Sequence, residues 1–302
     1  MRLRPAAFCL SCVLFLPPTL PGAETNPAPL SPVGPEAFQV MRQFFEYDPG
    51  VSLDVRLIRR SEQPDYVREK IVFSGSRTER VPAYLALPRN ARGPVPCVLL
   101  LHGLTGSKEI WWRADDAMAG LAPLLLERGF AVLALDAQYH GERLAGNDYQ
   151  PPTSFVEQGW FTASREMMVQ STIEYRRALD YLATRPEIDS ARIGVVGYSM
   201  GGIMTLNLCA VEPRVKAAVA CVPPIIKVPY LVTNVTHSAP HIRQPLLMLM
   251  ATRDERNYTA AEARELHSLV GSAVKELKFI EGEHMLPAEW ARQARAWIER
   301  QL

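Results

Sequence analysis

Ser199 has the sequence surroundings of a nucleophilic serine. It is the central residue of Gly-Tyr-Ser-Met-Gly (197–201), which has the form G-x-S-x-G. The apolar run 193–196 precedes this pentapeptide and predicts a buried strand, and residues 202–209 predict a helix after it. A sharp turn from strand to helix strains the backbone of its central residue and leaves room only for small neighbours. The two glycines meet this requirement. We therefore predict a nucleophile elbow; a glycine-rich turn with a solvated serine is the alternative.

The acid that serves this serine should follow it in the chain. A serine hydroxyl needs a base, a group that orients the base and donors for an oxyanion. In this topology the acid comes after the serine and the histidine comes last. The apolar run 245–251 predicts a buried parallel strand, and Asp254 lies just beyond it, where active sites of open α/β sheets occur. We predict Asp254 as the acid, with Glu255 as second choice; a loop residue that caps a helix from about Tyr258 is the structural alternative.

The base is predicted from the last strand. Residues 274–280 alternate as a strand does, and a loop follows at 281–285. His284 is the only histidine after this strand, so we predict that it takes the proton of Ser199. Its neighbour Glu283 is interpreted as a solvated loop charge.

Two backbone N–H groups are the predicted donors of an oxyanion hole. Met200 follows the serine at the start of a helix, where N–H groups are unpaired. Leu104 lies in the loop His-Gly-Leu-Thr-Gly (102–106), which follows an apolar strand at 96–101, and glycines there let the backbone approach a substrate oxygen. His102 is expected to brace this loop rather than to act as a base.

Several side chains are candidate substrate contacts. They are His102, Tyr198, Trp111 and Trp160, although core packing explains an indole equally well. Two long segments, 139–161 and 223–244, interrupt the regular order of elements and are expected to form the roof of a pocket. For the second segment, a simple connection between elements is the alternative. The histidines lack a ligand spacing such as H-E-x-x-H, so no metal is expected, and the chemistry needs no cofactor.

The order of predicted elements indicates the fold class. An antiparallel pair at 67–74 and 80–88 opens the domain, and strands then alternate with helices. Helices are predicted at about 116–128, at 164–184 and from about Pro287, and a further strand at 215–222. Such alternation predicts an α/β protein whose mostly parallel sheet has helices on both faces.

With these residues in place, the chain resembles an α/β-hydrolase, and within that superfamily the dienelactone hydrolase-like and acetyl xylan esterase-like serine esterases. The resemblance extends from about Tyr66 to the C-terminus. It rests on His102-Gly103, the segment Leu-Asp-Ala-Gln-Tyr-His-Gly-Glu-Arg (135–143), the elbow, Asp254 and His284. True dienelactone hydrolases use a cysteine nucleophile, and Ser199 stands in its place here. This departure argues for ordinary ester chemistry.

The resemblance implies a serine hydrolase that cleaves small-molecule carboxylic esters, with small acyl groups, through an acyl-enzyme. A peptidase or amidase with the same residues is the first alternative. Related folds with that activity often carry a propeller or a large cap, whereas the insertions here are modest. A non-catalytic binding protein of this fold is the second alternative, but such proteins usually lack part of the triad.

The N-terminus predicts export. Residues 1–5 are basic, 6–16 are apolar and 17–23 are small or proline, which together predict a secretory signal peptide over 1–23. The apolar stretch is too short to span a bilayer. A lipoprotein anchor at Cys12 is weakly supported. A proline-rich linker at 24–35 and a single domain at 36–302 complete the predicted organisation, which points to a secreted or periplasmic protein.

Composition excludes some classes of partner. Of 302 residues, 48% are hydrophobic, which suffices for one core of this size. The net charge is +1; loss of Arg2 and Arg4 with the signal peptide leaves 31 basic against 32 acidic residues, or −1. No nucleic-acid partner is therefore expected. Cys97, Cys209 and Cys221 are interpreted as buried apolar residues, with a bridge between the last two as the alternative. The sequence leaves the oligomeric state open.

Overall fold

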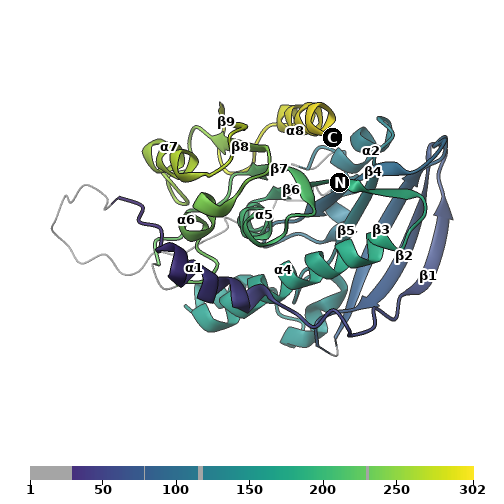
Figure 1. Cartoon of the computed structure of the whole chain (residues 1–302), viewed down its shortest axis with the longest axis horizontal. Helices are drawn as coiled ribbons and strands as arrows, with labels where there is room; N and C mark the ends of the chain where they lie inside the picture. Colours follow the sequence, from purple (N-terminus) through teal and green to yellow (C-terminus); the bar gives the residue numbers. More distant parts are fainter. Residues whose placement is uncertain (1–28, 78, 115–117, 229–230) are drawn as a thin grey trace, which may run out of the picture.

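The computed structural model describes residues 29–77, 79–114, 118–228 and 231–302 (Figure 1). The predicted signal peptide, Cys12 and the start of the predicted linker lie outside these ranges. Within them, one sheet of nine strands has the order β1-β2-β3-β5-β4-β6-β7-β8-β9. The strands are β1 (Arg56–Glu62), β2 (Tyr66–Ser74), β3 (Arg80–Pro88), β4 (Val95–Leu101), β5 (Ala131–Leu135), β6 (Ile188–Tyr198), β7 (Val215–Cys221), β8 (Leu246–Ala251) and β9 (Lys275–Ile280).

The sheet is mostly parallel, as the alternation of elements predicted. The strands β5, β4, β6, β7, β8 and β9 pair in parallel, whereas β1, β2 and β3 form an antiparallel extension that joins β5. Sequence analysis found the pair β2–β3 but missed β1. This edge strand is exposed along almost its whole length, so its sequence lacks the alternating apolar pattern that marks a half-buried strand.

Helices cover both faces of the sheet (Figure 1). The long helix α4 and the apolar helix α5 lie on one face, and α2 and α8 lie together on the other. Within the predicted helix at 116–128, α2 begins after Gly120, whose φ of 60° is left-handed, and residues 116 and 117 lie outside the described ranges. The helices are α1 (Pro35–Arg42), α2 (Leu121–Leu126), α3 (Thr153–Glu157), α4 (Phe161–Ala183), α5 (Met200–Val211), α6 (Val235–Ser238), α7 (Ala260–Leu269) and α8 (Glu289–Gln301), with 3₁₀ turns η1 (Gln43–Phe45), η2 (Lys108–Trp112), η3 (Gly141–Asn147) and η4 (Ala239–His241).

Burial on both faces explains the sequences of the central strands. Every residue of β5 and of β8 is buried, which is why these strands are continuous apolar runs. The register of the parallel pair β4–β6 places Leu101 opposite Gly197. The loop that follows β4 therefore begins beside the turn that follows β6.

The N-terminal part of the described chain packs on the outer side of α4 and α5. Phe38 of α1 and Phe45 of η1 share a second apolar cluster with residues of those helices. His241 stacks on Phe38 with ring centroids 3.5 Å apart, and His237 Nδ1 accepts a hydrogen bond from the Val33 N–H at 3.3 Å. These two histidines of the segment 223–244 therefore contact the N-terminal segment.

Two further observations concern the whole described chain. Cys97, Cys209 and Cys221 are buried free thiols, as predicted, and burial raises the pKa of each. In the part of the chain that the structure describes, no helix combines the length and the apolar character needed to cross a membrane.

Candidate active site

Ser199 is the single residue that connects a strand to a helix. β6 ends at Tyr198 and α5 begins at Met200, and Ser199 has φ 56° and ψ −117°. A non-glycine residue with positive φ is strained, and such strain is held only where neighbouring contacts require it. The Ser199 N–H donates to the Cys221 carbonyl at 2.9 Å, and the Ser199 carbonyl accepts from the Ile203 N–H at 3.1 Å. The elbow is thereby bonded to β7 and to α5.

The two glycines of the pentapeptide allow this turn. A Cβ on Gly197 would collide with the Gly201 carbonyl, and a Cβ on Gly201 would collide with the Leu101 carbonyl. Side chains at these positions would push α5 away from β6 and β4. The spacing of glycines two residues before and two after the serine is thus a packing requirement of the elbow.

Ser199, His284 and Asp254 lie in one hydrogen-bonded chain. The Ser199 hydroxyl is 2.8 Å from His284 Nε2, and His284 Nδ1 is 2.7 Å from Asp254 Oδ2. Since a carboxylate only accepts, Nδ1 carries the imidazole proton and Nε2 is left to accept from the serine. Such an arrangement can remove a proton from the hydroxyl while the carboxylate stabilises the charged imidazole.

The two candidate acids in the loop after β8 differ in burial and direction. Asp254 is buried and directed at His284, whereas its neighbour Glu255 is exposed. The Asp254 carbonyl accepts from the N–H groups of Asn257 and Tyr258 at 2.9 and 3.1 Å, which closes a turn ahead of α7. This turn holds the carboxylate at the end of the strand.

Asn257 is a site residue that sequence analysis missed. Its Nδ2 donates to Asp254 Oδ1 at 2.7 Å and lies 3.1 Å from His284 Nδ1. The amide occupies one carboxylate oxygen and leaves the other to the imidazole. An asparagine three residues after the acid, on the same loop, is a weak signal that could have pointed to it.

Tyr198 supports the histidine through its hydroxyl. The hydroxyl donates to the His284 carbonyl at 2.7 Å and accepts from the Leu286 N–H at 2.7 Å. Its ring packs edge-on to the imidazole, with centroids 6.3 Å apart, and the residue is only 2% exposed. Tyr198, predicted as a substrate contact, therefore lies under the histidine loop.

The loop after β4 lies against the elbow. A Cβ placed on Gly103 would be 3.3 Å from the Ser199 Cβ, so glycine allows this close approach. The Gly103 carbonyl accepts from His102 Nδ1 at 2.8 Å and from the Gly106 N–H at 2.9 Å. His102 Nε2 accepts from the Ala137 N–H at 3.1 Å, and burial lowers the pKa of this histidine. His102 is thus a neutral side chain that cross-links two loops.

A buried ion pair joins the same two loops further on. Lys108 Nζ contacts Asp136 Oδ2 at 2.7 Å, and both side chains are almost fully buried. Burial alone would lower the pKa of Lys108, but Asp136 and Glu142 raise it. Gly141 has φ 53°, and a Cβ there would collide with the Asp136 carboxylate. These contacts account for Asp136 and Gly141 within the segment 135–143.

The two tryptophans predicted as candidate substrate contacts, Trp111 and Trp160, have different surroundings. Trp111 is 0% exposed and belongs to the main core, whereas Trp160 is 48% exposed and packs beside Phe155 in the segment 139–161. Of the two, only Trp160 presents its indole to solvent. No group of three or more His, Cys, Asp or Glu side chains that could hold a metal ion occurs within the described ranges.

A small pocket adjoins the loop after β4. Its volume is about 280 Å³, and its walls come from residues 104–113 and 140–152. The apolar part of the lining consists of Leu104, Ile110, Leu144, Pro151 and Pro152. The first of the two long segments thus contributes a wall beside the loop that carries Leu104.

Comparison with known proteins identifies the family. Residues 81–280 match the model of the dienelactone hydrolase family. The chain belongs to this family. The matched range contains the serine and the acid, and His284 lies four residues beyond it. The sheet and helices of this family member have the α/β-hydrolase fold.

The chain shares low sequence identity with its individual relatives. It is 27% identical over 173 residues to the putative hydrolase YtaP of Bacillus subtilis (strain 168), covering 55% of this chain and 56% of that protein. It is 28% identical over 123 residues to the esterase YjfP of Escherichia coli (strain K12), covering 41% and 43%. The chain thus spans about half the length of these curated relatives. The acetyl xylan esterase of Paenibacillus sp. R4 superposes with a TM-score of 0.68 at 17% identity, covering 88% of this chain and 94% of that one.

Proposed function

We propose that the protein is a serine esterase that hydrolyses carboxylic esters of small acyl groups through an acyl-enzyme. The observation that carries this proposal is the hydrogen-bonded chain from the strained Ser199 through His284 to Asp254. Family membership and the resemblance to an esterase support ester hydrolysis.

The first half of the reaction forms the acyl-enzyme. The Ser199 oxygen attacks the ester carbonyl while His284 Nε2 takes its proton, and Asp254 stabilises the imidazolium. The N–H groups of Met200 and Leu104 bind the oxyanion of the tetrahedral intermediate. The intermediate collapses as His284 gives its proton to the leaving alkoxide. The alcohol departs and the acyl group stays on Ser199.

Water completes the cycle by the same route. His284 takes a proton from a water molecule, whose oxygen attacks the acyl carbon. The second tetrahedral intermediate releases the carboxylic acid, and the proton returns to the Ser199 oxygen. The residues of this chain supply every proton transfer.

The pocket beside Leu104 is proposed to hold the acyl group. His284 and Asp254 follow β9 and β8, on one side of β6, whereas the pocket is lined by loops after β4 and β5, on the other side. The leaving alcohol must lie near the histidine that protonates it, so the acyl group points away from it. A volume of about 280 Å³ fits a compact acyl group.

Covalent labelling tests the proposed function. We expect a fluorophosphonate to label Ser199, located by mass spectrometry, and p-nitrophenyl acetate to be hydrolysed. The variant Ser199→Ala should lose both, whereas Ser190→Ala, an exposed serine on the same strand, should keep both. Ester turnover by Ser199→Ala would contradict the proposal. Labelling of Ser199 with hydrolysis of peptide anilides but not of matched esters would replace esterase by amidase.

Export is proposed from the N-terminal sequence alone. The basic, apolar and small-residue zones of residues 1–23 support a signal peptide and a secreted or periplasmic location. Fractionation of cells that express the full chain, with N-terminal sequencing of the product, tests this. A product that begins at Met1 in the cytoplasm would contradict it.

A further inference from the structure

His140 lies between two carbonyl groups. Its Nε2 is 2.8 Å from the Leu104 carbonyl and its Nδ1 is 2.7 Å from the Gln138 carbonyl. Carbonyl oxygens only accept, so each of these contacts is a hydrogen bond only when the ring nitrogen carries a proton. The His140 side chain is 2% exposed, so both contacts lie in the interior, where polar groups need hydrogen-bond partners.

The Leu104 carbonyl occupies a sensitive position in the loop. The Gly106 N–H donates to the Gly103 carbonyl, which closes a four-residue turn with Leu104 and Thr105 at its centre. The central peptide of such a turn is the unit whose orientation distinguishes one turn type from another. Its carbonyl here is that of Leu104, and His140 Nε2 contacts this carbonyl.

The peptide before it presents the proposed oxyanion donor. His102 and Gly106 both donate to the Gly103 carbonyl. In a trans peptide the next N–H, that of Leu104, points the opposite way. The direction of the Leu104 N–H therefore depends on the peptides on both sides of Leu104, one held by His102 and the other by His140.

We propose that His140 is a positioning residue for the oxyanion hole, because its Nε2–H holds the Leu104 carbonyl and with it the turn that aims the Leu104 N–H at the substrate. This inference rests on the proposed function of Ser199 and Leu104. Burial, with contributions from His102 and Arg143, lowers the pKa of His140 to about 3, so the neutral ring has one proton to share between two carbonyls. The proposal requires the tautomer with that proton on Nε2.

This requirement leads to a matched pair of variants. The amide nitrogen of glutamine reaches the position of Nε2, and that of asparagine reaches the position of Nδ1. His140→Gln should therefore keep the bond to Leu104, whereas His140→Asn should keep only the bond to Gln138. His241→Gln, in the contact with Phe38, is a control for the loss of a histidine elsewhere.

The experiment measures kcat and KM for p-nitrophenyl acetate and the Ki of phenylboronic acid, whose tetrahedral adduct places an oxygen in the oxyanion hole. We expect His140→Asn to lose roughly 10- to 100-fold in kcat and to bind the boronate correspondingly more weakly, with KM little changed. His140→Gln should stay within about threefold of the parent kcat, since the donor to Leu104 is restored.

Several results would overturn the proposal. Equal kcat values for His140→Gln and His140→Asn, or a change confined to KM, would show that the Nε2 donor does not act on the oxyanion. The thermal unfolding midpoints of both variants are measured as well. A loss of kcat that merely parallels a loss of thermal stability would also overturn the proposal. The proposed function fails separately, if Ser199→Ala retains turnover. An inactive Ser199→Ala beside a fully active His140→Asn would refute the positioning role alone.

Discussion

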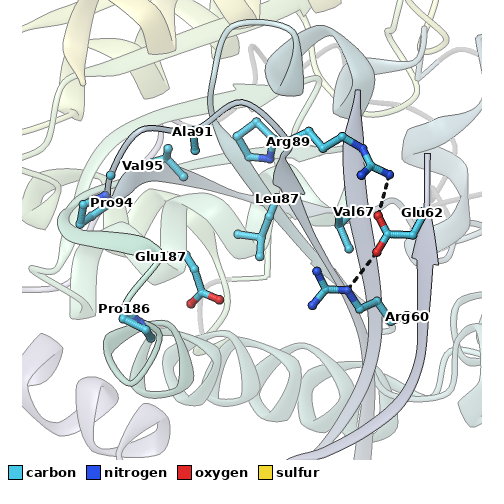
Figure 2. Close-up of a pocket in the computed structure, with 12 residues that line it drawn as sticks. Arg60, Glu62, Val67, Leu87, Arg89, Ala91, Pro94, Val95, Pro186 and Glu187 are labelled. Carbon is cyan, nitrogen blue, oxygen red and sulfur yellow. Dashed lines mark hydrogen bonds and ion pairs between the residues drawn. The ribbon is translucent and has the colours of Figure 1, made fainter. Parts of the chain in front are cut away.

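The two ends of the parallel sheet each carry a hollow, but the larger one is lined by paired charges and the smaller one mostly by apolar and uncharged residues. At the end where the parallel strands begin, a cavity of about 680 Å³ lies between β3 and the start of β4 (Figure 2). Glu62 pairs there with Arg60 at 3.2 Å and with Arg89 at 2.6 Å, and Glu187 pairs with Arg185 at 2.9 Å. None of the residues that line this cavity has a strained, positive φ.

The opposite end has a smaller pocket and a strained serine. Ser199 has a positive φ, and its hydroxyl reaches an imidazole rather than a charged partner. In the larger hollow, by contrast, the carboxylates of Glu62 and Glu187 are held by arginine side chains. In this fold, the strained, hydrogen-bonded serine is therefore a better guide to the proposed chemistry than the size of a cavity.

Removing a carboxylate at each end gives the largest expected contrast. Asp254→Asn should lower kcat about 10⁴-fold, because the amide no longer fixes the imidazole tautomer or stabilises its charge. Glu187→Gln should change kcat by less than about twofold, since an exposed ion pair contributes little. Ester kinetics of the two purified variants provide the measurement. A comparable loss in both variants would abolish the distinction between the two ends.

The carboxylate also depends on its own support. Asn257→Ala frees Asp254 Oδ1 and should lower kcat by roughly 10-fold or more, because a small displacement of the acid misaligns the histidine. Asn257→Ser is the matched control, since its shorter side chain stays polar. Steady-state kinetics and thermal midpoints distinguish misalignment from unfolding. Unchanged kcat in Asn257→Ala would show that the turn alone positions Asp254.

Filling each hollow tests which of them accepts substrate. Leu144→Trp narrows the pocket beside Leu104 and should lower kcat/KM for p-nitrophenyl hexanoate roughly 10-fold relative to the acetate, because overfilling excludes the longer chain. Ala91→Trp fills the cavity of Figure 2 and should leave the ratio between the two esters unchanged. The opposite result would place the acyl group elsewhere.

The smallest expected effect concerns acid stability. Burial would raise the pKa of Glu142, but its bonds to Lys108 and Lys70 lower it below 4.5; Arg185 likewise lowers that of Glu187. A carboxylate with a lowered pKa in the folded chain stabilises the fold above its unfolded pKa and ceases to do so as the pH falls through the folded value.

Urea unfolding at pH 7 and below pH 4 measures this difference. Glu142→Gln should lose more of the pH dependence than Glu187→Gln, because Lys108 is buried whereas Arg185 is half-buried. The side chain of Glu142 is 43% exposed, so solvent screening limits its contribution to less than about 1 kcal/mol. Equal pH dependence in the two variants would show that the buried lysine gives no extra stabilisation.

Most of the fold could be predicted because local patterns determined it. The apolar runs of β4, β6, β7 and β8 have few alternatives to burial on both faces, and the order of strands and helices implies a parallel sheet. The exposed strand β1 was missed, since its residues pair with β2 through the backbone and bury no alternating face.

The candidate site likewise has a part that local sequence predicts and a part that it does not. The elbow can be predicted from neighbouring residues, because the turn itself needs the glycines at 197 and 201. The roles of Tyr198 and His140 cannot be predicted in this way, because their partners lie 86 and 36 residues away in the chain. A side chain's neighbours in sequence carry no record of such contacts.

Spacing and the burial of neighbouring residues were thus enough to predict the fold class, the elbow and the chain order of Ser199, Asp254 and His284. Only the tertiary structure decided that Asp254 rather than Glu255 faces the histidine, that Tyr198 bonds the histidine loop and that His140 holds the Leu104 carbonyl. Hydrogen bonds act over about 3 Å in space, and packing of the sheet, not distance along the chain, brings these groups that close.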